Sequence, residues 1–225
     1  KIIFFLLMNS KSNSEFYLNN KEIIDIYNIC ANKRPELRYS ISELIKQFCI
    51  FIAQNNIEIS QMTPEFEYQF GNIYYENEFV PRNINKAIYY YSKAADFNHS
   101  ESQYKLGLIF YQNKYVSQDV NKVIYYCTSA AKQGNSKAAH ILGNIFYDNK
   151  LINCNINKAI YYYSLAGELN NDCSLFLLGS IYSSDEYVPK DIDKALTYYR
   201  KSAKLKNQMA QVTLGDFYLE GKYVK

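Results

Sequence analysis

The chain has 225 residues, of which 48% are hydrophobic and 21% are charged, so it can bury a continuous core and is not disordered by composition. The formal net charge of +3 is small, and the lysines are scattered rather than gathered into the dense basic stripe that a nucleic-acid partner requires. The cysteines are odd in number and form no CxxC pair, which favours a reducing compartment and hence a cytoplasmic location.

The N-terminal residues Lys1–Met8 (KIIFFLLM) form the one strongly apolar run of the chain. A membrane span needs about 20 such residues, so no membrane span is predicted. A secretory signal is the less favoured interpretation, because no initiator Met precedes the run and Asn9–Ser14 lacks a small-x-small cleavage site. We interpret the run as a buried structural segment.

The segment Lys21–Phe48 is predicted to form two helices joined by a turn at Asn32–Pro35. It resembles the C-terminal end of a protein-kinase C-lobe, in which an apolar helix and a Cys precede P-x-x-R-P-S and another apolar helix. The matching positions are Pro35, Arg38, Ser40 and Leu44. Tyr39 departs from the pattern, where the family has its second proline. Residues 1–53 are therefore either a remnant of such a lobe or a generic helical cap for the rest of the chain.

Residues 54–63 are predicted to be a linker, with Thr63 as a helix N-cap and Pro64 in the first helical position. From there, five of the eight glycines follow one another at intervals of 36 residues. They are Gly71, Gly107, Gly143, Gly179 and Gly215. Apolar residues stand one before and two and three after each glycine, so they share one helical face and predict a helix, here called helix A.

A second helix, here called helix B, is predicted to follow each helix A. Six residues after the glycines, the chain has side chains that tolerate the left-handed conformation at a helix end, namely Asn77, Asn113, Asn149, Asp185 and Gly221. Asn83, Asp119, Asn155 and Asp191 are then suited to be N-caps of helix B. Helix B is predicted to end at Asn98, Gly134 and Asn170. The following helix A is predicted to be capped by Ser100, Ser136 or Asp172.

Each helix B carries an apolar stripe at spacings of three and four residues, such as Ala87, Ile88 and Tyr91. One pair of short helices cannot bury such a stripe, whereas stacked pairs can. A glycine inside a helix costs about 1 kcal/mol relative to alanine. Its recurrence therefore predicts that helix B approaches helix A there without room for a side chain.

The segment Leu106–Gly134 resembles a Sel-one-like repeat (SLR), a 36-residue relative of the tetratricopeptide repeat, and the resemblance recurs in phase over residues 64–225. It implies an all-α fold, an α-α superhelix that forms a right-handed solenoid of antiparallel helix pairs, with four full repeats and a partial fifth. Family members are typically adaptors, so the resemblance implies a scaffold that binds a protein or peptide in a concave groove, in signalling or quality control.

No convergent catalytic constellation is found in the sequence. The only histidines, His99 and His140, stand at different phases of the repeat, and Cys154 and Cys173 match no zinc spacing. We therefore predict no enzyme activity, no cofactor and no metal site.

Tyrosine is over-represented, with 24 residues, and allows two interpretations. In the first, runs such as Tyr89–Tyr91 and Tyr161–Tyr163 are packing residues of helix B. In the second, the positions three before, one after and four after each glycine line a ligand groove, because tyrosine offers a large contact area at modest ordering cost. These positions are Tyr68, Asn72, Tyr75, Tyr104, Leu108, Tyr111, His140, Asn144, Tyr147, Phe176, Ser180 and Ser183.

Two further expectations concern the ends of the chain. It starts without Met and stops at Lys225 inside an expected loop, which suggests a fragment, and its repeats could then select substrates for a protein kinase whose catalytic part is missing. In the partial fifth repeat, Leu214 and Phe217 are predicted to be partly uncovered, so self-association is expected.

Overall fold

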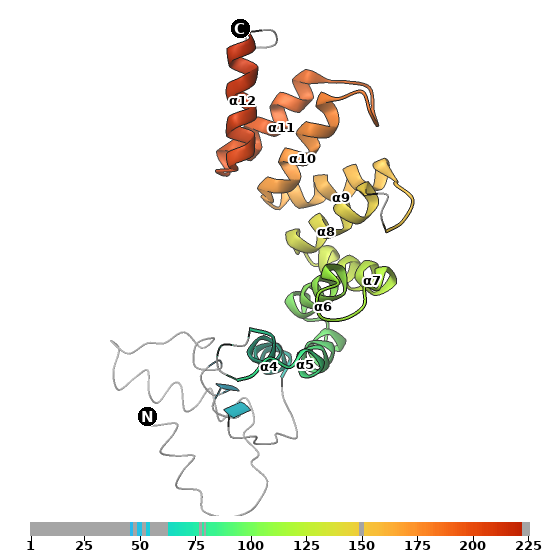
Figure 1. Cartoon of the computed structure of the whole chain (residues 1–225), viewed down its shortest axis with the longest axis vertical. Helices are drawn as coiled ribbons and strands as arrows, with labels where there is room; N and C mark the ends of the chain where they lie inside the picture. Colours follow the sequence, from blue (N-terminus) through green and yellow to red (C-terminus); the bar gives the residue numbers. More distant parts are fainter. Residues whose placement is uncertain are drawn as a thin grey trace, which may run out of the picture. The chain divides into compact units, whose positions relative to one another are not determined.

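The computed structural model describes residues 63–76, 78, 80–148 and 151–221, together with residues 46, 49, 50, 53 and 54. Within these residues the chain is helical, without strands, as Figure 1 shows, and the predicted all-α class is confirmed. The helices are α4 (Pro64–Glu76), α5 (Ile84–Asp96), α6 (Ser100–Gln112), α7 (Val120–Lys132), α8 (Ser136–Tyr147), α9 (Ile156–Glu168), α10 (Asp172–Ser183), α11 (Ile192–Lys204) and α12 (Gln208–Glu220). The helices predicted within Lys21–Phe48, and with them the kinase-like resemblance, lie outside the described residues, of which only Lys46 falls in that segment.

The chain divides into two compact units, with the boundary inside α6 between Ser102 and Gln103. In the first unit α4 packs on α5, and in the second α8 packs on α9 and α10 on α11, so in these three repeats helix A contacts its own helix B. Within the second unit, successive pairs are also in contact, through α7 with α8, α9 with α10, and α11 with α12. This order of pairs is the one expected of an α-α superhelix.

The predicted N-caps of helix B are confirmed. The side chains of Asn83, Asp119, Asn155 and Asp191 each accept a hydrogen bond from the backbone N–H three residues later, over 2.9–3.1 Å. At three of these caps the backbone N–H also donates to the carbonyl of the aromatic residue that stands three after the glycine of helix A. The cap therefore fixes the start of helix B and ties it to the preceding helix A.

The predicted caps of helix A are wrong by one residue. Ser136 and Asp172 are the first helical residues of α8 and α10, while Asn135 and Asn171 accept the capping hydrogen bonds over 3.0 and 2.9 Å. Before α6 the same position is held by His99, whose Nδ1 accepts from the N–H of Ser102. The residue before the helix acts as the cap, and not the first helical residue, because its extended backbone directs its side chain at the unpaired N–H groups of the first turn.

The left-handed residues between helix B and the next helix A are as predicted, with φ of 63° at Asn98, 85° at Gly134 and 60° at Asn170. The fourth such position is Lys206 with φ of 69°, a residue type that gave no signal in the sequence. After helix A, Asn113 and Gly221 are left-handed as predicted, and Asn77 and Asn149 lie outside the described residues.

The left-handed prediction for Asp185 is wrong, because the chain has no positive φ there. The residue serves the loop through its side chain instead, since its carboxylate accepts a hydrogen bond from the N–H of Lys190 over 2.8 Å. The amide oxygen of Asn113 makes the corresponding bond with the N–H of Gln118 over 3.1 Å. An Asn or Asp at this position is therefore explained by a loop-closing hydrogen bond, whichever backbone conformation it has.

Four of the five recurrent glycines mark a close contact between helix A and helix B, as predicted. A Cβ added at Gly143 would overlap the ring of Tyr163, and at Gly107 it would overlap the Sγ of Cys127. The same overlap is found between Gly71 and Tyr91 and between Gly179 and Tyr199. We call the side chain that fills this notch the knob of helix B.

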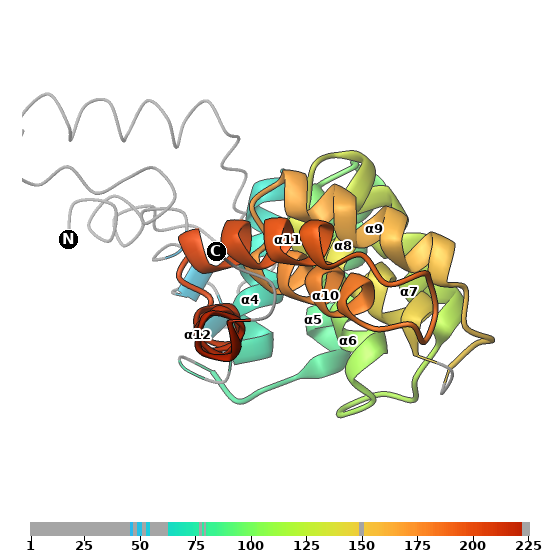
Figure 2. The same ribbon diagram turned by 90° about the horizontal axis from the view of Figure 1, so that it is seen from above.

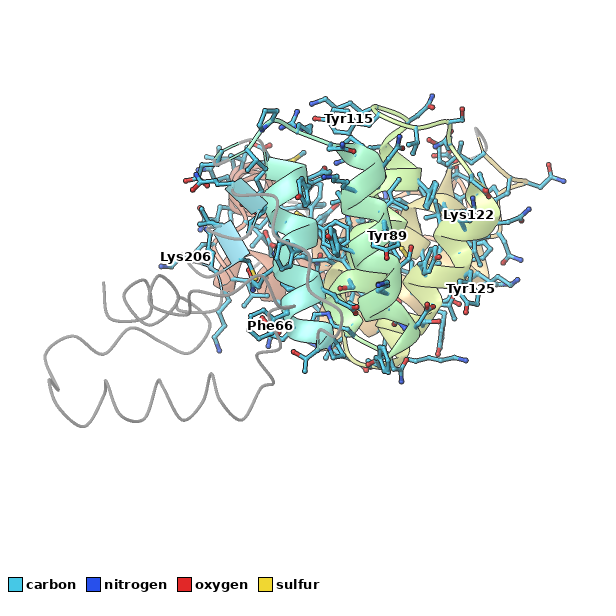
Figure 3. The ribbon with its side chains drawn as sticks, turned by 90° about the horizontal axis from the view of Figure 1, so that it is seen from below. Phe66, Tyr89, Tyr115, Lys122, Tyr125 and Lys206 are labelled. Carbon is cyan, nitrogen blue, oxygen red and sulfur yellow. The ribbon has the colours of Figure 1, made fainter. Side chains whose placement is uncertain are left out.

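The tyrosine runs of helix B divide their roles. The residue directly before each knob is a tyrosine that stacks on the helix-A ring three after the glycine, with ring centroids 5.6–6.4 Å apart. A lysine from the first turn of helix B covers the same ring, with Nζ 3.9–4.9 Å from the centroid. Two residues before the knob, Tyr89, Tyr125 and Tyr161 are 52%, 67% and 62% exposed, and each meets the ring of the following tyrosine edge-on, with centroids 5.0–5.2 Å apart. Figure 3 labels Tyr89 and Tyr125, for which the packing interpretation holds only in part.

Candidate functional site

The predicted groove positions form a row on each helix A, here called the A row. In the first unit the A row consists of Tyr68, Asn72 and Tyr75 on α4. In the second unit it consists of Tyr104, Leu108 and Tyr111 on α6, His140, Asn144 and Tyr147 on α8, and Phe176, Ser180 and Ser183 on α10. All twelve side chains are half-buried. The A row therefore contributes both to packing and to the surface.

The middle position of the A row is used within the repeat. The knob hydroxyl of Tyr163 donates to the amide oxygen of Asn144 over 2.8 Å. Tyr91 does the same to Asn72 over 2.8 Å, and Tyr199 to the hydroxyl of Ser180 over 3.3 Å. These acceptors satisfy the knobs, whose burial raises the pKa of Tyr91 and Tyr163.

The sequence carried a signal for these pairs that was missed. Each acceptor stands 19 residues before its tyrosine. In the repeat where the knob is Cys127, which has no hydroxyl, the residue 19 positions earlier is the apolar Leu108. The residue type at the middle position thus follows the hydrogen-bonding needs of the knob.

His140 links two successive repeats of the second unit. Its Nδ1 lies 2.8 Å from the hydroxyl of Ser174 on α10, and the amide nitrogen of Asn144 lies 3.3 Å from its Nε2. Asn144 presents its oxygen to Tyr163, so it donates its N–H to Nε2, and Nε2 accepts in the neutral imidazole. Burial lowers the pKa of His140, and the carboxylate of Asp172 opposes this shift.

We predict that acid weakens the protein through His140. The neutral ring is favoured in the fold, whereas an unfolded histidine has a pKa of about 6.5. The unfolded chain therefore binds more protons below that pH, and stability falls by at most about 1.4 kcal/mol per pH unit until the folded pKa is reached. Urea unfolding at pH 7.5 and pH 5.0 should show a smaller loss for His140→Gln than for the unchanged chain. Equal losses would show that the ring does not contribute.

In the first unit, an acid, a histidine and a serine are joined by two successive contacts. The Oε2 of Glu65 is 3.5 Å from Nε2 of His99, and Nδ1 of His99 is 3.0 Å from the hydroxyl of Ser102. The His99 hydrogen bond lowers the pKa of Glu65. Ser102 is 0% exposed, so it cannot meet a substrate. The arrangement caps α6 and does not form a nucleophilic site.

Apart from Ser183, the outer positions of the A row in the second unit carry aromatic rings. Tyr147 packs against Tyr163 and against Tyr187, a loop residue, with centroids 6.3 and 5.4 Å apart. Phe176 lies against Tyr199 at 5.5 Å. Because these rings are held by neighbours while remaining half-buried, they offer ordered apolar surface.

In the described part of the chain, no group of three or more His, Cys, Asp or Glu side chains is placed to hold a metal ion. Cys49 and Cys127 are buried free thiols, and burial raises the pKa of Cys127 to about 12, which keeps it protonated. The helices in this part are also too short and too polar to span a bilayer.

Comparisons with known proteins agree with this architecture. The family model of the Sel1 repeat matches residues 64–99, 100–135, 136–171 and 174–207, which is more than half of the chain. A Sel1 repeat protein from Oxalobacter formigenes is similar over 98% of this chain and 85% of its own, with 21% identity and a TM-score of 0.71. A protective antigen of uropathogenic Escherichia coli with an SLR fold is similar over 93% of this chain and 46% of its own, with 22% identity and a TM-score of 0.71. No curated protein matched the sequence.

Proposed function

Because the chain belongs to the Sel1 repeat family, we propose that it is a non-catalytic scaffold that binds a protein segment along the A rows of α6, α8 and α10. Sel1-repeat proteins are helical, typically serve as protein-interaction scaffolds and are generally not enzymes. The chain would thus act by bringing proteins together, in signalling or in quality control. It would need no cofactor.

One observation carries the location of the binding surface. The A row of the second unit presents half-buried aromatic rings from the A helices of three successive repeats, including Tyr104, Tyr111, Tyr147 and Phe176. Rings of this kind combine an apolar body with a fixed position, so they lose little entropy on binding. The amide and hydroxyl groups between them serve the knobs, so contact with a ligand would be mainly apolar.

The test uses peptides selected on the full chain from a random displayed library, so that no partner needs to be known. The variant Tyr111→Ala plus Tyr147→Ala removes two rings of the A row from neighbouring repeats. We expect this variant to bind the selected peptides at least about tenfold more weakly, since it removes apolar contact area at two sites.

The matched control is Tyr125→Ala plus Tyr161→Ala. These rings have the same spacing of 36 residues and the same unit, but they are exposed residues of helix B. The control should bind the peptides as the unchanged chain does, and circular dichroism should show both variants folded. If the control loses binding and the A-row variant keeps it, the binding surface lies on helix B and the proposal is wrong.

The kinase-linked alternative and the cytoplasmic location stay predictions from the sequence. The first depends on Lys21–Phe48, almost all of which lies outside the described residues, and no observation favours it. The predicted location depends on the odd number of cysteines and the lack of a CxxC pair in the sequence.

A further inference from the structure

Two tyrosine rings meet at the C-terminal end of α8. Tyr147 is the last residue of α8, and Tyr187 belongs to the loop that joins α10 to α11. Their ring centroids are 5.4 Å apart and the ring planes meet at 60°, and we call these two rings the tyrosine pair. Figure 2 shows this loop, in orange, at the same end of the second unit as the loop between α8 and α9. Both rings are half-buried, so each keeps part of its surface open to solvent.

Negative charge is found beside the tyrosine pair. The side chain of Glu186 is exposed, and its interaction with Tyr187 raises the pKa of that tyrosine to about 12. Burial raises the pKa of Tyr147, and the charge of Glu186 adds to this shift. The carboxylate of Glu186 therefore acts on both rings. Asp148, directly after α8, adds a second carboxylate at the same end of the helix.

The helix ends add to this negative potential. The last turns of α8 and α10 contain no basic residue, whereas the last turn of α11 contains Lys201 and Lys204. The C-terminal end of a helix carries a partial negative charge, which stabilises a cation placed near its last turn. In α8 that end lies at Tyr147, so its partial charge has the same sign as the nearby carboxylates.

The lysines of the second unit that meet helix-A rings do so on the side of helix B. Each of α7, α9 and α11 places a lysine 3.9–4.9 Å from the centroid of such a ring, as with Lys158 over Phe146. Within the described residues, no lysine or arginine is found over Tyr147 or Tyr187, and Glu186 takes part in no ion pair. The tyrosine pair therefore offers the same attraction for a cation to a group from another molecule.

We propose that the protein segment bound along the A rows carries a lysine or arginine whose side chain packs against Tyr147 and Tyr187, with its charge beside Glu186. The carbon stem of such a side chain packs on a ring, and its charge is attracted both by the ring faces and by the carboxylates. An acidic side chain would be repelled there, so charge complementarity selects a basic one. The inference rests on the proposed function, because Tyr147 belongs to the A row, and it names the residue type that the bound segment supplies.

The probes are the peptides selected on the full chain from a random displayed library. The selected sequences should contain lysine or arginine more often than the library does. In the tightest-binding peptide, replacing each basic residue in turn by glutamine should identify one whose loss weakens binding at least about threefold. Affinities are measured by fluorescence anisotropy.

The change in the chain is Glu186→Lys, which turns attraction for a basic side chain into repulsion. It should weaken the original peptide at least about fivefold and leave the glutamine-substituted peptide unaffected, because the two groups act on each other. The matched control is Glu168→Lys, which reverses an exposed carboxylate at the C-terminal end of α9 in the same unit and should change neither affinity.

A second pair of variants tests the ring. Tyr187→Phe keeps the ring and should bind the original peptide as the unchanged chain does. Tyr187→Leu keeps an apolar side chain without a ring and should bind about threefold more weakly. Circular dichroism should show both variants folded. Equal affinities of the two variants would show that the ring of Tyr187 does not meet the charge.

Two results would overturn the inference. The selected peptides could show no enrichment in lysine or arginine, or Glu186→Lys could leave their affinity unchanged. If Tyr111→Ala plus Tyr147→Ala weakens binding while Glu186→Lys has no effect, the inference fails and the proposed function stands. Tyr111→Ala plus Phe176→Ala changes the A rows and keeps the tyrosine pair. If this variant has no effect while Glu186→Lys weakens binding, recognition of a basic side chain stands and the proposed function fails.

Discussion

Gly143→Ala is expected to lower the free energy of unfolding by about 1–3 kcal/mol, although alanine is the better helix former by about 1 kcal/mol. The added Cβ would overlap the ring of Tyr163, and its distance from Cγ, the ring atom nearest the backbone, would be only 3.0 Å. That ring is 1% exposed and its hydroxyl is held by Asn144, so it has no room to move aside. Urea unfolding followed by circular dichroism measures the effect.

The chain supplies its own control in Gly215→Ala. The helix position is the same, but no described atom lies within 4 Å of the added Cβ, so only the helix-forming preference acts. We expect this variant to gain about 0.5–1 kcal/mol. If both substitutions stabilise the protein, the inference that helix B leaves no room for a side chain at Gly143 is wrong.

These glycines also show why so much of the fold could be predicted from the sequence. A residue that is unfavourable inside a helix recurs at a constant interval only if each repeat imposes the same contact on it. The N-caps of helix B were predictable for the same reason, because Asn83 and its equivalents are all Asn or Asp and have no capping residue directly beside them. Before helix A, the pairs Asn135–Ser136 and Asn171–Asp172 each contain two capping residues, and composition cannot choose between them.

The candidate site was less predictable, because a row of residues on one helix does not show what covers it. Helical spacing puts the A row on one side of helix A, but the partial burial of all twelve residues depends on the neighbouring helices. The hydrogen bond from Tyr163 to Asn144 and the contact of His140 with Ser174 join residues 19 and 34 positions apart. Only a comparison of residue types between repeats, as with Leu108 and Cys127, could have suggested the first of these.

Tyr161 and Tyr163 stand two positions apart on α9, and one ring is exposed while the other is buried. This pair therefore separates the packing role of a tyrosine from its presence on the helix surface. Tyr163→Ala is expected to destabilise the protein by about 3–5 kcal/mol, because it removes the buried knob, leaves a cavity beside Gly143 and takes the hydroxyl donor from Asn144. Tyr161→Ala changes a ring that is 62% exposed on the same helix, and its effect should stay within about 0.5 kcal/mol. The two stability losses are compared by measuring the denaturant midpoints of both variants under the same conditions. Similar losses would mean that the tyrosines act through helix formation alone, since two nearby positions of one helix differ in burial and hardly in propensity.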